Sequence, residues 1–115
     1  MDFTPTPEQN ALTQTVARAC EPFDDDYWAD HDRNAVFPDD FHQTMAECGV
    51  LGIAMPEEYG GTGLGVTEAA LVMHQVARSS GAMSAASAIH INIFGPNPIA
   101  VYGTEDQKIR WLPDL

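Results

Sequence analysis

Twenty-six consecutive residues, Ser79 to Thr104, contain no Asp, Glu, Lys or Arg, although the whole chain carries a formal net charge of -12. An uncharged run of this length cannot face water on all sides, so its apolar positions need cover from other parts of a folded protein. The run does not suit a membrane span, because hydroxyl and amide side chains, a histidine and two prolines interrupt it. The uncharged run therefore predicts a segment that forms a buried wall of a folded domain. Whether this wall also lines a pocket is left open.

The chain is strongly acidic, with 17 Asp and Glu against 5 Lys and Arg. Such a surface repels nucleic acid and anionic membranes, so we expect neither as a partner. The acidic excess favours solubility, and an acidic docking face for a basic partner is the alternative. A length of 115 residues suits one domain, which we place at residues 1–115.

The two cysteines, Cys20 and Cys48, form neither a zinc pattern nor a disulfide framework. We expect both to be buried free thiols. The polar, acidic N-terminal sequence lacks the basic and then apolar start of a signal peptide, which favours a cytoplasmic protein.

Helix signals occur along the whole chain, and no segment shows the alternation of a strand. Capping boxes predict helix starts after Thr6 and Thr104, and Gly49 is placed to close a helix in the left-handed conformation. The expected helices cover about residues 7–22, 24–33, 37–48, 66–78, 82–94, 98–102 and 105–112. The predicted fold class is therefore all-α, an irregular helical bundle.

Two segments invite chemical interpretations that their spacing does not support. The glycine-rich piece Gly60–Gly65 fails the G-x-G-x-x-G pattern and follows no strand, so we expect a turn rather than a phosphate cradle. The acidic segment 24–32 lacks the glycine and the terminal Glu of a calcium-binding loop. We expect no metal site, and no nucleophile or general base emerges from the sequence.

His90 is the one side chain in the uncharged run whose residue type changes charge near neutral pH. Because apolar residues occupy every side of the predicted helix 82–94, we expect that helix to be central and covered all round. His90 is then either a core histidine with its hydrogen bonds satisfied or a polar group lining a ligand cavity, with Ser87 on the same helix face.

Three segments, taken in order, resemble acyl-CoA dehydrogenases. They are Glu47–Gly52, which matches E-x-G-x-x-G; Pro56–Gly65, which reads PEEYGGTGLG; and Tyr102–Leu115, which contains the family's G-[ST]-x-x-Q-K and [WY]-L-P-x-L elements. The whole chain is similar to the N-terminal helical domain of that family. The resemblance implies an FAD enzyme that removes the α-proton of an acyl-CoA thioester while hydride leaves Cβ for the flavin.

The resemblance also implies that the family's middle β-barrel domain and C-terminal helical domain, which hold much of the flavin and the catalytic Glu, are absent from residues 1–115. The chain is then an isolated domain, a proteolytic remnant or a truncated product, inactive alone, with FAD expected in the parent and not on this chain. It carries no catalytic residue, and its cofactor-binding residues are not identified. The implied partners of the parent are acyl-CoA and electron-transfer flavoprotein.

By position, the resemblance makes five residues candidates for lining the acyl-chain pocket: Ala86, Ser87, His90, Ile91 and Phe94. His90 and Phe94 would shorten the cavity, which favours a short, branched or polar-tipped acyl group. Two other readings are an acyl-CoA oxidase or flavin monooxygenase of the same fold and a non-catalytic helical interaction module.

Apolar surface prepared for the missing domains would be exposed in this chain, so we expect a homo-oligomer. The residues expected near that surface are Met55, Met83, Ile93, Phe94 and Ile99.

Overall fold

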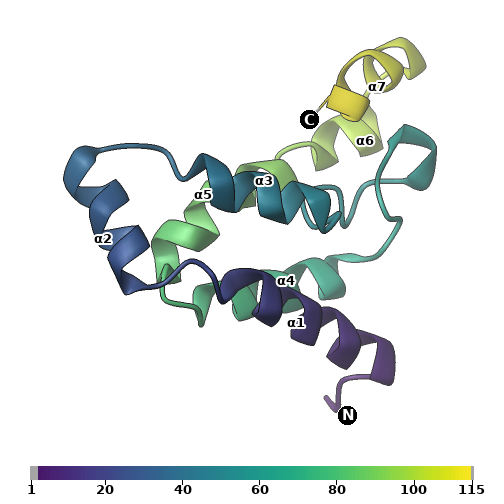
Figure 1. Cartoon of the computed structure of the whole chain (residues 1–115). Helices are drawn as coiled ribbons and strands as arrows, with labels where there is room; N and C mark the ends of the chain where they lie inside the picture. The colour runs from purple at the N-terminus through teal and green to yellow at the C-terminus, as the bar shows by residue number, and fades with distance from the viewer. Residues whose placement is uncertain (1–2, 115) are drawn as a thin grey trace.

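A computed structural model describes residues 3–114, and in this range every regular element is helical (Figure 1). In chain order the elements are α1 (Pro7–Cys20), α2 (Asp25–Asn34), α3 (Asp39–Glu47), η1 (Glu57–Tyr59), α4 (Val66–Ala77), α5 (Ala82–Phe94), α6 (Asn97–Tyr102), α7 (Glu105–Trp111) and η2 (Leu112–Asp114), where η marks a single 3-10 turn. The all-α prediction is confirmed. Residues 1, 2 and 115, the last of which closes the third family-like segment, lie outside the described residues.

The ends of the helices follow the capping signals of the sequence. The Thr6 hydroxyl accepts a hydrogen bond from the Gln9 amide at 3.2 Å, and the Gln9 side chain accepts one from the Thr6 amide at 3.0 Å. The same reciprocal box starts α7 at Thr104. Gly49 follows α3 with a φ of +71°, as predicted. Each observed α-helix boundary lies within about two residues of the predicted one. At Thr6, Gly49 and Thr104 the caps satisfy backbone groups that a helix leaves unpaired.

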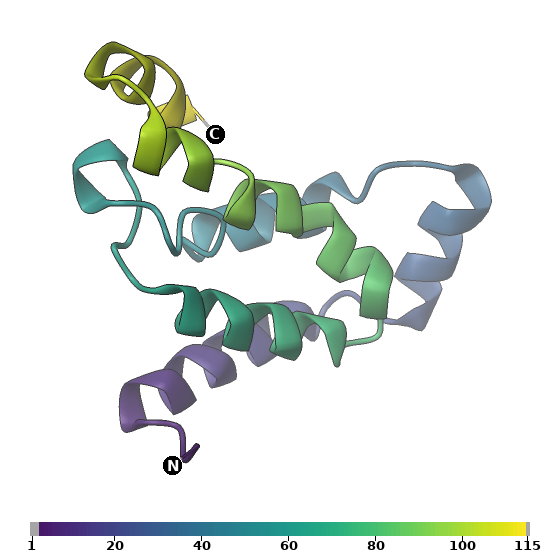
Figure 2. The same ribbon diagram turned by 180° about the vertical axis from the view of Figure 1, so that it is seen from behind.

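Four helices enclose the main core. α1 lies along α4, α4 lies along α5, and α3 contacts both α1 and α5 (Figures 1 and 2). Each contributes side chains with 0% exposure, among them Val16, Met45, Val72 and Ile89. Burial of each such side chain contributes about 1.5–3 kcal/mol, so the core fixes one side of α5 against its neighbours.

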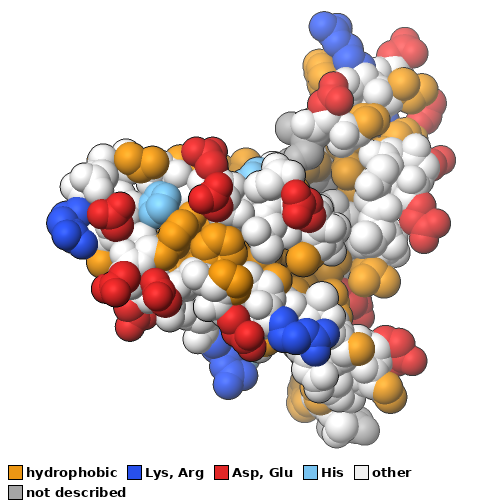
Figure 3. All heavy atoms as spheres, viewed as in Figure 1, with side chains coloured by type: hydrophobic (Ala, Val, Ile, Leu, Met, Phe, Trp, Pro, Cys, Tyr) orange, Lys and Arg blue, Asp and Glu red, His pale blue; other side chains and the backbone are white. Residues whose placement is uncertain are grey.

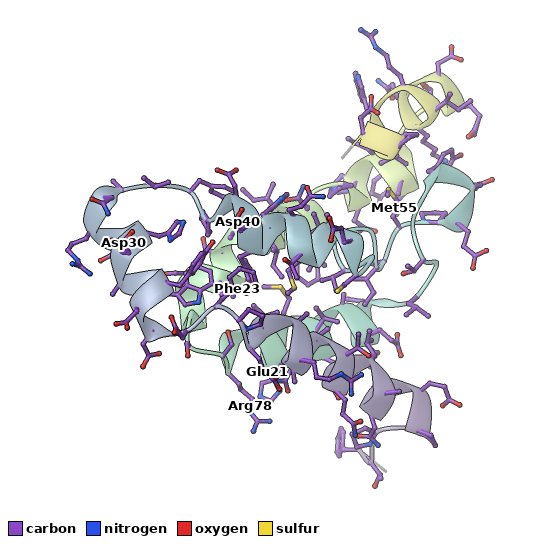
Figure 4. All side chains as sticks on the ribbon, viewed as in Figure 1. Glu21, Phe23, Asp30, Asp40, Met55 and Arg78 are labelled. Atoms are coloured by element: carbon purple, nitrogen blue, oxygen red, sulfur yellow. The ribbon has the colours of Figure 1, made fainter. Side chains whose placement is uncertain are left out.

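An aromatic cluster attaches α2 to this core. The rings of Phe23 and Tyr27, and of Trp28 and Phe41, meet edge to face with centroids 4.9 and 5.0 Å apart. Trp28 Nε1 donates a hydrogen bond to the Phe23 carbonyl at 3.1 Å. Phe23, labelled in Figure 4, therefore contributes both its ring and its backbone to the position of α2.

The C-terminal helices α6 and α7 project from the body of the molecule (Figure 2). The radius of gyration is 14.8 Å, against about 13 Å for a compact domain of this length. The Tyr59 hydroxyl donates to the carboxylate of Glu105 and so ties the loop before α4 to the start of α7. Tyr59 and Leu112 are both buried, yet neither belongs to the main core cluster.

Two expectations about burial need correction. Cys20 is a buried free thiol as predicted, but Cys48, which follows the last residue of α3, is exposed. Ile93 is 4% exposed and packs in the core rather than on a docking surface, whereas Met83 and Phe94 are exposed as expected. No helix within residues 3–114 is both long and apolar enough to cross a membrane.

Candidate functional site: the two faces of helix α5

Helix α5 has two apolar faces, and only one of them is covered. Four side chains face the core: Ala85, Ala86, Ile89 and Ile93. Five others face outward and are exposed: Met83, Ser87, His90, Ile91 and Phe94. With about 100° of rotation per residue, each set falls on one side of the helix, and the centres of the two sides are about 130° apart. We call the second set the α5 stripe; at about 1.5 Å rise per residue it is about 17 Å long.

The sequence predicted that this helix is covered on all sides, and that expectation is wrong for one side. The side of α5 that packs in the core consists of Ala and Ile side chains. On the other side, Met83 is 74% exposed and Ile91 is 67% exposed. Four of the five predicted pocket residues share the stripe: Ser87, His90, Ile91 and Phe94. The fifth, Ala86, is 4% exposed and belongs to the core behind it.

His90 is exposed, so the expectation of a core histidine is wrong. Its Nδ1 lies 2.9 Å from the Ser87 carbonyl oxygen. Since a carbonyl only accepts, Nδ1 carries a proton in this contact, and Nε2 is left as an acceptor when the ring is neutral. The α5 stripe thus presents one polar nitrogen among thioether, aliphatic and aromatic groups.

Hollows lie on both sides of the stripe. One of about 280 Å³ lies at its C-terminal end, where Phe94 meets Leu64 and Val66 from the start of α4. Another of about 270 Å³ lies between Ser87 and the segment Phe37–Pro38 before α3. No acidic or basic side chain lines either hollow, which matches the uncharged sequence of this region.

The glycine-rich loop next to the stripe is folded on itself. Its successive amides, from Gly60 to Leu64, donate to the backbone carbonyls of Glu57, Pro56, Gly52, Met55 and Ile53. The Gly65 amide donates to the carboxylate of Glu68 at 3.1 Å. Because these N–H groups already have partners, the loop offers no phosphate cradle, as the sequence predicted.

The same observations bear on a flavin. A diphosphate needs unoccupied N–H donors or cations, and the loop provides neither near Gly63, whose neighbour is the side chain of Glu57. This loop therefore does not fit the diphosphate of a flavin. Within residues 3–114, no three His, Cys, Asp or Glu side chains gather closely enough to hold a metal ion.

Two side-chain links between distant parts of the chain were not predicted from the sequence. The Gln9 Nε2 donates to Glu68 at 2.8 Å, which joins the first turns of α1 and α4 and lowers the pKa of Glu68. The hydrogen bond from Tyr59 to Glu105, together with burial, raises the pKa of Tyr59 to about 12. The partners are 59 and 46 residues apart, so only the folded chain brings them together.

Comparisons with known proteins cover nearly the whole chain. The sequence profile of "Acyl-CoA dehydrogenase, N-terminal domain" matches residues 6–115. The chain is 35% identical to the acryloyl-CoA reductase (NADH) of Anaerotignum propionicum over 115 residues, and 37% identical to the mitochondrial isovaleryl-CoA dehydrogenase of Pongo abelii over 110 residues. These alignments cover 100% and 94% of this chain but only 29% and 26% of the two relatives.

A solved structure shows the same arrangement. It is described as the electron transferring flavoprotein of Acidaminococcus fermentans, in work on flavin-based electron bifurcation. One of its chains superposes with a TM-score of 0.84 at 30% sequence identity, and the match covers 98% of this chain and 30% of the other.

Proposed function

This chain belongs to the family of the acyl-CoA dehydrogenase N-terminal domain, and from that membership we propose that it forms one wall of the acyl pocket in an enzyme that dehydrogenates an acyl-CoA thioester at its α and β carbons. The observation that carries the proposal is the α5 stripe, an exposed surface without charge in a protein of net charge -12. Such a surface suits the alkyl part of a thioester, since burial of apolar groups on both sides is favourable.

The stripe suits the acyl end of the substrate rather than its nucleotide end. Coenzyme A is anionic at its phosphates, and residues 79–104 contain no Lys or Arg to bind them. We therefore propose that the phosphates contact portions of the enzyme outside this chain. Ala86 would support the wall from behind, and His90 and Phe94 would limit its length, in keeping with a short, branched or polar-tipped acyl group.

Acyl-CoA dehydrogenases are FAD enzymes, and FAD supplies the electron sink of their reaction. Because the glycine-rich loop does not fit the diphosphate of a flavin, we propose that the family's other domains hold the flavin and supply the catalytic base. The chain alone should then be inactive. Incubation with FAD, isovaleryl-CoA and a dye acceptor should give no reduction above a protein-free control, and turnover by the isolated chain would reject this part of the proposal.

The pocket role is tested by His90→Ala in a protein that joins this domain to the family's flavin and catalytic domains. We expect the ranking of kcat/KM along a series of straight, branched and hydroxylated acyl-CoA substrates to shift toward longer acyl groups. His74→Ala, on the exposed side of α4, is the matched control and should leave the ranking unchanged. An unchanged ranking in His90→Ala would reject a lining role for this residue.

We also propose that exposed apolar residues such as Met83 and Ile91 drive homo-oligomer formation by this chain. The net charge opposes association, so added salt should strengthen it by screening. Light scattering across a concentration series tests this, and a strictly monomeric chain at high salt and high concentration would reject it.

For the parent enzyme, we propose electron-transfer flavoprotein as the electron acceptor. We propose a cytoplasmic location as well, supported by two cysteines that are both free, and cell fractionation would test it.

A further inference from the structure

A groove between α2 and the first half of α5 combines an apolar floor with an acidic rim. One hollow of about 270 Å³ is lined by Trp28, His31, Asp32, Ala35, Val36, Pro38 and Ser84. The hollow at Phe37 described above shares Pro38 and Ser84 with it, so the two hollows are neighbours. We call the combined feature the α2–α5 groove. Engineered cavities of about 150 Å³ hold a benzene molecule, so either part has room for one bulky apolar side chain.

The floor of the groove is apolar and accessible. Val36 is 54% exposed and Phe37 is 50% exposed, in the connection between α2 and α3. Beneath them the indole of Trp28 is 8% exposed and is fixed by its hydrogen bond to the Phe23 carbonyl. The fixed Trp28 indole thus forms the base of the groove, and exposed apolar side chains form its walls. In a pocket of this kind an inserted side chain supplies most of the binding energy.

The rim of the groove carries the Asp32 carboxylate, and the chain segment around it is acidic. Residues 24–40 contain seven Asp and one Arg, and Figure 3 shows acidic side chains spread over this end of the molecule. Asp30 on α2 and Asp40 on α3, both labelled in Figure 4, come from the two helices joined by the connection that carries Val36 and Phe37. Acidic groups around an apolar pocket favour a partner with basic groups around an apolar side chain, because complementary charge speeds association and disfavours other partners.

Two polar side chains in the groove, His31 and Asp32, present hydrogen-bond acceptors. His31 Nδ1 lies 2.8 Å from the Tyr27 carbonyl and donates to it, so its Nε2 is an acceptor in the neutral ring. The Asp32 carboxylate adds further acceptors. Lys and Arg side chains carry only donors and so match this set.

Other occupants fit less well. A second copy of this chain has a net charge of -12 and only 5 Lys and Arg, so it would bring like charge to an acidic rim. Anionic lipid and nucleic acid meet the same repulsion. We propose that the α2–α5 groove is a docking site for a basic segment of a partner protein, in which one aromatic or leucyl side chain enters the groove and flanking Lys or Arg side chains contact the acidic rim.

The probe is the blocked peptide Lys-Lys-Phe-Leu-Lys-Lys, added to the 115-residue chain and followed by amide chemical shifts in NMR spectra. Two control peptides keep one property each: Glu-Glu-Phe-Leu-Glu-Glu keeps the apolar pair, and Lys-Lys-Gly-Ser-Lys-Lys keeps the charge. We expect the first peptide to shift amides of α2, the α2–α3 connection and the first half of α5, and to bind more weakly at high salt.

Matched variants separate docking from general attraction between a basic peptide and an acidic protein. Val36→Ser is compared with Val101→Ser, since the two valines are 54% and 56% exposed. The double change Asp39→Asn and Asp40→Asn in the first turn of α3 is compared with Glu57→Gln and Glu58→Gln in the first turn of η1.

We expect Val36→Ser and the Asp39, Asp40 pair each to weaken binding about fivefold or more, and the two controls to change it less than about twofold. Equal effects within either matched comparison would overturn the proposal, because they would show that the groove or its rim is not the contact. Equal binding of the control peptides, or no binding of the first peptide at low salt, would overturn it as well.

Discussion

Replacing Ile89 by Ala tests the division of α5 into a covered and an exposed face. Ile89 is 0% exposed, whereas Ile91, of the same type and two residues further on, is 67% exposed. A buried Ile→Ala change costs about 2–5 kcal/mol, because the lost carbons leave a cavity that the surrounding core refills only in part. At Ile91 the removed groups already face water, so we expect a change within about 0.5 kcal/mol.

The difference is large against the stability of the whole chain. Small domains unfold with about 5–15 kcal/mol, so Ile89→Ala would remove a substantial fraction of it. With an unfolding entropy of about 2.1 cal/mol/K per residue, a chain of 115 residues has about 0.24 kcal/mol/K. A loss of about 3 kcal/mol then lowers Tm by about 12 °C.

The assay is urea and thermal unfolding followed by circular dichroism at 222 nm, repeated over a concentration series to separate folding from self-association. We expect Ile89→Ala to lower the midpoint at every concentration. Ile91→Ala should keep the midpoint of the dilute chain and reduce only its dependence on concentration. Equal losses of stability in the two variants would refute the assignment of the two faces.

Three further predictions concern single groups. The free energy of unfolding should fall as the pH rises from about 10 to about 12, because the unfolded chain loses the Tyr59 proton first, and urea titrations of Tyr59→Phe should lack this component. Cys48 should react with a thiol reagent in the native chain, whereas Cys20 should react only on unfolding, since burial also raises the pKa of its thiol; equal labelling rates in mass spectra would contradict this. Gly81→Ala should cost about 1–3 kcal/mol in thermal unfolding and Ala82→Gly less than about 0.5 kcal/mol.

The local part of the fold was accessible from the sequence. The boxes at Thr6 and Thr104 and the glycine after Cys48 fix helix ends through groups three or four residues apart, so reading them needs no tertiary information. Helix α5 was placed at 82–94, and the structure has the same bounds. Its orientation was not accessible, because Ile89 and Ile91 are identical in type and only the packing of α3 and α4 decides which is covered.

At Cys48 the helical spacing of apolar residues predicts burial wrongly, although it predicts burial correctly for the two earlier residues of the same pattern. Phe41, Met45 and Cys48 have helical spacing, and the first two are fully buried. The pattern assumes that the helix continues through Cys48, but α3 ends at Glu47 and Gly49 turns the chain with a positive φ. A periodic stripe predicts burial only within the helix that carries it, and the final position depends on the cap.

The junction between α4 and α5, at Gly81 and Ala82, is a second place where packing decides what the sequence pattern does not. The predicted helices leave residues 79–81 between them, and glycine is the residue type that most readily adopts a left-handed conformation. In the structure Gly81 has an ordinary φ of -74° and Ala82 has the φ of +44°. Gly81 is needed for space instead, since a Cβ there would lie 2.3 Å from the Trp28 ring. The glycine thus lets the α2 indole pack against the start of α5, and so it shapes the floor of the α2–α5 groove and the placement of the α5 stripe together.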